Sequence, residues 1–112
     1  MDYRLKKEKD FNRVFNKGKR IFSSSLTLVY LESDCLKFGL AVSKKHGGSV
    51  VRNRIKRILR ESFRSFAPSL RGNFFFVFIP KVKEDYSLDS FKKDMNYMLK
   101  KGGFLVEDKK PS

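Results

Sequence analysis

The chain has 112 residues, of which 40% are hydrophobic, and a formal net charge of +14. This length suits one domain over residues 1–112 with a single modest core, and the hydrophobic content excludes a disordered tail. Such a charge favours polyanionic partners, nucleic acid before an anionic membrane surface. Cys35 is the only cysteine, and no apolar run approaches the roughly 20 residues that span a bilayer. We therefore expect a protein of the reducing cytoplasm.

The N-terminal part of the chain predicts a short helix. Residues 1–7 are basic and are expected to be loose. The segment "KEKDFNRVFNKG" predicts a helix that ends at Gly18, because glycine is favoured just past a helix end. Phe11, Val14 and Phe15 follow the i, i+3, i+4 spacing of one helix face. "KRIF" then predicts a very short strand.

Two strands are expected next. In "LTLVYLE", residues 26–32, successive side chains should alternate between two faces. Leu28 and Tyr30 fall on one face, and Val29 falls on the other. "LKFGLAVS", residues 36–43, predicts a second strand, and the short "SDC" connection favours an antiparallel hairpin between the two.

The second half of the chain predicts a helix, a strand and a helix. Ser49 is a candidate N-cap for a helix over about residues 50–66, and Ser87 is one for a last helix that ends at Gly102. Between them "NFFFVFIP", residues 73–80, is apolar on both faces, as a central buried strand is. Residues 104–112 are expected to be loose. The order α-β-β-β-α-β-α, with a very short first strand, predicts an α+β fold, a sandwich with one sheet.

The helix over residues 50–66 carries a concentration of positive charge. On a helical wheel its apolar residues share one side, which we expect to pack on the sheet. The polar side holds many cations and a single acid, Glu61. A solvated helix face usually mixes charges of both signs, so this pattern favours a phosphate-rich partner instead. The residues that we expect to face it are Arg52, Asn53, Arg54, Lys56, Arg57, Arg60 and Arg64.

The loop before this helix extends the basic stretch. Lys44 and Lys45 precede "HGGS", and the N–H groups of a helix N-terminus favour anions. His46 has no second His, Cys or carboxylate at ligand spacing, so we expect a loop residue near RNA rather than a metal ligand. The loop is not a P-loop, because the GK[ST] element is missing.

The aromatic residues allow two interpretations. Phe11, Phe15 and Tyr30 could be core residues, or they could form a trough in which unpaired bases stack. The continuous run at residues 74–78 is assigned to the core. The carboxylates are scattered and show no acid/base pair, and the lone His and lone Cys make no triad. The chain by itself therefore predicts a binding protein, with no catalytic residue and no metal site.

The segment "GLAVSKKHGGSVVRNRIKRILRESFR" resembles the signature region of the bacterial ribonuclease P protein subunit. "RLKKEKDFNRVFNKGKR" and "LTLVYL" are similar to that family's N-terminal segment and next strand. The resemblance covers about residues 4–100. It implies an α+β fold like the second domain of ribosomal protein S5, with a left-handed β-α-β crossover, whereas about 98% of such crossovers are right-handed.

The resemblance also implies a function. In that family the RNA subunit catalyses the Mg²⁺-dependent endonucleolytic removal of the 5′ leader from precursor tRNA, and the protein binds that RNA and the leader. By position, the residues that would face the catalytic RNA are Lys44, Lys45, Arg52, Asn53, Arg54, Lys56, Arg57 and Arg60. Those that would form the leader cleft are Phe11, Phe15, Leu28 and Tyr30. The protein alone would be a monomer without a tightly bound cofactor.

Two other functions stay open on the residues alone. A ribosomal or general RNA-binding protein would share the charge and the fold class, without a role in tRNA processing. A helix that lies on a membrane surface would need an exposed apolar face. The helix over residues 50–66 needs that face for the core, which counts against the membrane alternative.

Overall fold

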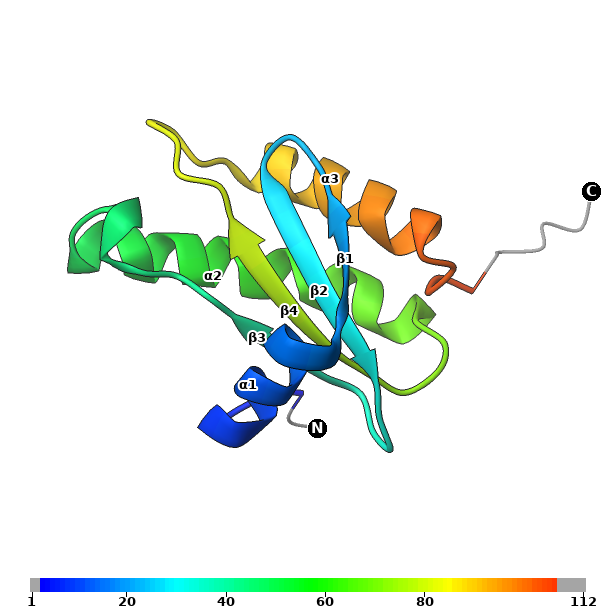
Figure 1. Cartoon of the computed structure of the whole chain (residues 1–112). Helices are drawn as coiled ribbons and strands as arrows, with labels where there is room; N and C mark the ends of the chain where they lie inside the picture. Colours follow the sequence, from blue (N-terminus) through cyan, green and yellow to red (C-terminus); the bar gives the residue numbers. More distant parts are fainter. Residues whose placement is uncertain (1–2, 107–112) are drawn as a thin grey trace, which may run out of the picture.

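The computed structural model describes residues 3–106. Within this range one sheet separates a pair of long helices from a short helix, so that the molecule has three layers (Figure 1). The elements are α1 (Glu8–Lys17), β1 (Lys19–Phe22), β2 (Leu26–Glu32), β3 (Lys37–Leu40), η1 (Lys44–His46), α2 (Ser49–Phe66), η2 (Ala67–Ser69), β4 (Phe74–Pro80) and α3 (Leu88–Lys101). The α+β class and the element order are as predicted.

The four strands lie in the order β1-β2-β4-β3. β4 is antiparallel to β2 over its whole length, from Leu26 opposite Pro80 to Glu32 opposite Phe74. β3 is parallel to β4, and α2 forms the crossover between them. The predicted hairpin of β2 and β3 is therefore wrong. β4 is apolar on both faces, so burial between two strands stabilises it more than an edge position would. The left hand of the crossover stays a prediction.

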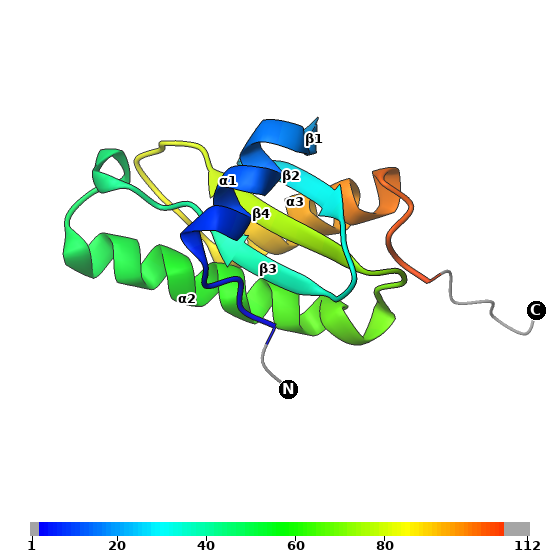
Figure 2. The same ribbon diagram turned by 60° about the horizontal axis from the view of Figure 1, so that its bottom comes forward.

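The sheet has two unequal apolar faces. The larger core lies under α2 and α3, where Leu26, Leu28, Phe76 and Phe78 pack against Phe63 and its neighbours. A smaller cluster lies under α1 and is built around Val14, Val29, Phe75 and Val77. Figure 2 shows α1 and α2 on opposite sides of the sheet. One face is thus covered by two helices and the other by one.

The helix ends follow the sequence with one exception. Gly18 follows α1 directly, and the Ser87 hydroxyl accepts a 3.2 Å hydrogen bond from the Ser90 N–H at the start of α3, both as predicted. Ser49, the predicted N-cap of α2, is instead its first helical residue, and Gly48 is the N-cap. α2 therefore begins one residue earlier than expected, and Gly48 supplies no side-chain acceptor to its first turn.

Both terminal segments are packed further than predicted. Residues 3–7 were expected to be loose, yet the Leu5 N–H donates to the Phe38 carbonyl at 2.7 Å and the Leu5 side chain is 5% exposed. At the other end Phe104 is buried, and the Val106 N–H donates to the Ser69 carbonyl. Burial of the two apolar side chains offsets the entropy of ordering these segments. The rest of both predicted loose segments lies outside the described residues.

The β1–β2 turn is held against α3 by Asp94. Its Oδ2 accepts hydrogen bonds from the Ser25 N–H at 2.9 Å, from the Ser25 hydroxyl and from the Ser24 hydroxyl at 3.1 Å. Burial alone would raise the pKa of Asp94, but the hydrogen bonds from Ser25 and Ser24 and the charge of Lys83 outweigh it. The pKa therefore lies below its ordinary value, and the ionised carboxylate stabilises this end of the sheet.

Candidate RNA-binding surfaces

The cations of α2 form two groups that differ in burial. Arg52, Lys56 and Arg60 follow one another at four-residue spacing and are half-buried on the flank of α2 next to β3. Arg54 and Arg57 are exposed, as are Asn53 and Arg64. At about 100° per residue, this second group turns away from the core side of the helix. The predicted charged face thus comprises an outer group and a row that borders the sheet.

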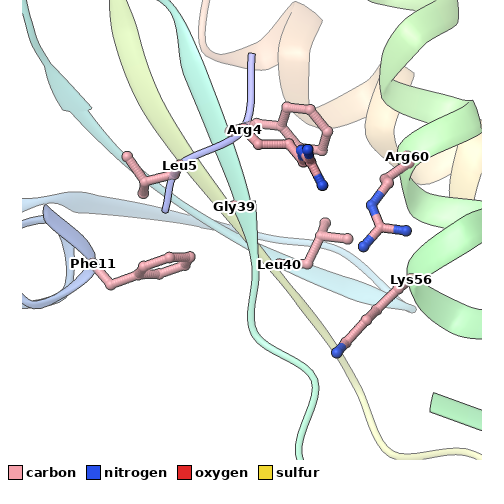
Figure 3. Close-up of a pocket in the computed structure, with 8 residues that line it drawn as sticks. Arg4, Leu5, Phe11, Gly39, Leu40, Lys56 and Arg60 are labelled. Carbon is pink, nitrogen blue, oxygen red and sulfur yellow. The ribbon is translucent and has the colours of Figure 1, made fainter. Parts of the chain in front are cut away.

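Two members of the half-buried row, Lys56 and Arg60, line a small pocket at the edge of β3. The pocket has a volume of about 150 Å³, and Arg4 reaches it from the N-terminal segment while Lys56 and Arg60 reach it from α2 (Figure 3). Phe11 comes to it from α1, on the other side of the strand. Gly39 lets α1 approach this closely, since an added Cβ would stand 2.5 Å from the ring of Phe11. Three cations around a phosphate-sized space suit one backbone phosphate.

The Arg52 guanidinium has one unusual feature. Its Nε is buried and has no hydrogen-bond partner among the described residues. A buried donor without a partner costs free energy, and a charged one costs more.

The η1 loop places two further cations at the start of α2. Lys44 and Lys45 are exposed, while His46 is buried. The loop leads through Gly47 and Gly48 into the first turn of α2. The predicted catalytic-RNA residues of the loop and of α2 therefore lie on consecutive elements, with the lysines at one end and Arg60 toward the other.

The structure does not bring the four predicted leader-cleft residues together on one face of the sheet. Leu28 is fully buried in the core under α2 and α3, so it has no surface to offer a nucleotide. Tyr30 shares that face, where its ring centroid lies 4.8 Å from that of Phe104. Phe11 and Phe15 pack against the cluster under α1, on the opposite side of the sheet. Because side chains alternate along β2, residues 28 and 30 could not join α1 on one face.

The face under α1 offers a different set of residues. Phe11 and Phe15 are half-buried, and their rings stack with centroids 6.5 Å apart. Ala41 and Ile79 pack against the same small cluster as these rings, and both also line a hollow of about 570 Å³. Its other lining residues come from the ends of β2, β3 and β4 and from the η1 loop: Thr27, Leu40, Val42, Ser43, Lys45, His46, Pro80, Lys81 and Val82. A groove with apolar walls and lysines can hold a single strand without reading its sequence.

Sequence reasoning missed Thr27, Ala41, Ile79 and Lys81. The signal was present, because Thr27 has the same strand parity as Val29 and Leu31, which form the other face of β2. The period of two identifies the two faces but does not say which of them faces α1. The aromatic ring of Tyr30 favoured the wrong choice.

The described residues show no other kind of site. Within residues 3–106 no three His, Cys, Asp or Glu side chains gather as metal ligands would, and no helix is long and apolar enough to cross a bilayer. Cys35 is half-buried beside the small cluster. The fold, the cationic helix and the lysine-lined hollow define a class of protein: a small, basic, RNA-binding α+β protein.

Comparisons with known proteins identify the family within this class. The family model described as Ribonuclease P matches residues 1–103. The ribonuclease P protein component of Streptococcus agalactiae is 35% identical over 105 residues, which cover 92% of this chain and 96% of that protein. The protein of Caldanaerobacter subterraneus is 37% identical over 101 residues, 88% of this chain and 87% of its own length. The chain belongs to the ribonuclease P protein family.

A solved structure of the same family agrees with the fold. The Staphylococcus aureus RNase P protein superposes with a TM-score of 0.83 at 27% identity, over 94% of this chain and 99% of that one. The sequence resemblance to this family is therefore confirmed, and so is the fold class that it implied.

Proposed function

We propose that this chain acts as the protein component of a ribonuclease P holoenzyme, in which it binds the catalytic RNA and the 5′ leader of precursor tRNA. The observation that carries the proposal is the family match over residues 1–103, together with a cationic α2 at the matching positions. The holoenzyme is an endoribonuclease of tRNA 5′ maturation. The RNA subunit supplies catalysis, and this chain supplies binding.

The catalytic RNA is assigned to the surface made by η1 and α2. Exposed Arg57 and Arg54 reach outward, while Lys56 and Arg60 line the pocket at β3. Arg52 lies one turn before Lys56 on α2. A folded RNA brings phosphates close enough together to contact both groups, and the released counterions drive association. Arginine suits this role because its fork matches two phosphate oxygens at once.

The leader is assigned to the face under α1. Phe11 and Phe15 give aromatic surface, and the hollow past Ile79 gives Lys45 and Lys81. Stacking accepts any base, which suits a subunit that meets leaders of many sequences. Lys45 belongs to η1 and also lines the hollow, so the two surfaces meet at this loop.

The metal and the compartment stay proposals as well. We expect Mg²⁺ to act through the RNA rather than through tight binding to this chain, and we expect the free protein to be monomeric. A single cysteine fits the cytoplasm, where tRNA precursors are processed.

Reconstitution tests the proposal directly. The protein is mixed with its cognate catalytic RNA and a precursor tRNA at low Mg²⁺, and mature 5′ ends are measured with and without protein. We expect the protein to raise the yield of mature ends, and Arg57→Ala to reduce that gain. A general RNA-binding protein would bind the RNAs without stimulating cleavage at the mature 5′ end, and that result would favour the alternative.

A further inference from the structure

The η1 loop is closed by a buried histidine. His46, the only histidine of the chain, is 8% exposed although it lies in a loop of exposed lysines. Its Nε2 stands 2.6 Å from the carbonyl oxygen of Pro80, at the end of β4. Its Nδ1 stands 3.0 Å from the backbone nitrogen of Ser43, at the start of the loop. The ring therefore bridges the loop and the sheet.

These contacts use both nitrogens of the ring. A carbonyl oxygen only accepts, so Nε2 carries a proton and donates it to Pro80. In the neutral ring Nδ1 then has a free lone pair, which accepts the hydrogen bond from the Ser43 N–H. Nδ1 also stands 3.2 Å from the carbonyl oxygen of Ser43, so both ring nitrogens have backbone partners.

The partner of the ring is itself anchored. The N–H of Lys81, the residue after Pro80, donates to the Ser25 carbonyl at 2.9 Å, and the Ser25 N–H donates to Asp94 on α3. His46 thereby joins the loop to β4, the β1–β2 turn and α3. Figure 2 shows the η1 loop and the chain after β4 at the same end of the molecule.

The two glycines after His46 give the loop its greatest backbone freedom. Gly47 has a φ of 132°, a conformation that side chains disfavour, and Gly48 follows it. Two adjacent glycines have the largest backbone entropy to lose. Without the bridge from His46 to Pro80 the loop would sample many conformations, and Lys44 and Lys45 would sample them with it.

We propose that His46 is a positioning residue for RNA binding. Its bridge to Pro80 holds Lys44 and Lys45 where the surface of α2 meets the hollow that Lys45 and Lys81 line. The inference rests on the proposed function, because the lysines must contact RNA for their position to matter. When the bridge holds the loop, both lysines contact phosphates in the complex. A loose loop makes fewer of these contacts and loses more entropy on binding.

Two substitutions separate the two hydrogen bonds. In His46→Asn the side-chain oxygen can replace Nδ1 and accept from Ser43, but the bridge to Pro80 is lost. In His46→Gln the longer amide can replace Nε2 and donate to Pro80. We expect His46→Asn to weaken binding of the catalytic RNA and to lower the salt slope, and we expect His46→Gln to restore most of the loss. Each lost phosphate contact lowers the slope by about one.

A double-mutant cycle with the lysines gives the decisive measurement. Lys44→Ala/Lys45→Ala should lower the slope by about two, so that the fall in affinity between 50 and 200 mM salt shrinks by about tenfold. His46→Asn should produce a similar change alone and little further change in the lysine-free background. A purely structural role would give additive losses in the two backgrounds, and that result overturns the inference.

The remaining outcomes separate this inference from the proposed function. If the lysine variants weaken RNA binding but His46→Asn does not, the result contradicts the role of the histidine and leaves the proposed function intact. If the lysine variants have no effect, the loop's place in the RNA surface is wrong and the histidine has nothing to position. If His46→Asn fails to fold, NMR order parameters of the unaltered protein still test whether His46 holds the loop in place. Lys44 and Lys45 should be as rigid as α2, and a mobile loop overturns the inference.

Discussion

The two faces of the sheet use the same strands for different purposes. Under α2 and α3 the apolar side chains are sealed into a core that contains Leu28 and Phe76 at zero exposure. Under α1 the cover is shorter, and beyond it the sheet borders the hollow that Ile79 and Lys45 help to line. On β2 and β4, residues of one parity pack in the larger core. Those of the other parity pack under α1 and, at Thr27 and Ile79, line the hollow. A shift of one residue therefore exchanges one role for the other.

The largest expected effect comes from the sealed face. Leu28→Ala should lower the free energy of unfolding by about 2–5 kcal/mol, because the emptied volume lies in a core that cannot collapse around it. Denaturant unfolding of the free protein measures the loss. Thr27→Ala, one residue away and on the face of the hollow, is the matched control and should cost clearly less. Similar losses for both would show that the two faces do not differ as described.

Leader binding tests the open face. Phe15→Ala should weaken the holoenzyme's affinity for precursor tRNA but spare mature tRNA, which has no leader. Base stacking on an aromatic ring is worth about 1–3 kcal/mol, so the loss should be roughly five- to over a hundredfold. Affinities for substrates with and without a leader give the measurement.

Tyr30→Ala is the control on the other face. Its ring packs against Phe74 and Phe104, so the variant should lower stability and weaken both substrates alike. A loss specific to the leader in Tyr30→Ala, with Phe15→Ala unaffected, would return the cleft to the side that the sequence suggested.

The sequence predicted where the helices and strands lie along the chain more reliably than which of them pack together in space. Periodicity and end residues located α1, α2, α3 and the central strand β4, because these signals are local. The position of β4 between β2 and β3 depends on pairing across the chain, which a short "SDC" connection does not reveal. The same limit explains Tyr30: alternation defined its face, but only the packing of α1 shows which face stays open. Likewise Leu5 is ordered by a distant partner, Phe38.

Acid should weaken the contact between α3 and the β1–β2 turn. The pKa of Asp94 is lowered in the folded protein, so its stabilising effect is present above the ordinary pKa of about 3.9 and is lost as the pH falls through the folded value. Asp94→Asn should cost about 0.5–1.5 kcal/mol at neutral pH, the range for a net hydrogen-bond contribution. The difference between the variant and the unaltered protein should shrink in acid. Thermal melts from neutral pH to about pH 3 measure it, and a constant difference would contradict this role.

The smallest expected effect concerns the outer cations of α2. Arg57 is exposed and turned away from the core, so Arg57→Ala should leave the melting temperature almost unchanged. If its guanidinium contacts one phosphate, the variant should lower the salt slope of catalytic-RNA binding by about one and weaken affinity by only a few fold at moderate salt. Arg54→Ala should do the same from the other flank of this group. Lys92→Ala, an exposed cation on α3, is the control and should leave the slope unchanged. Equal slopes for Arg57→Ala and Lys92→Ala would mean that the RNA responds to net charge alone and not to the surface of α2.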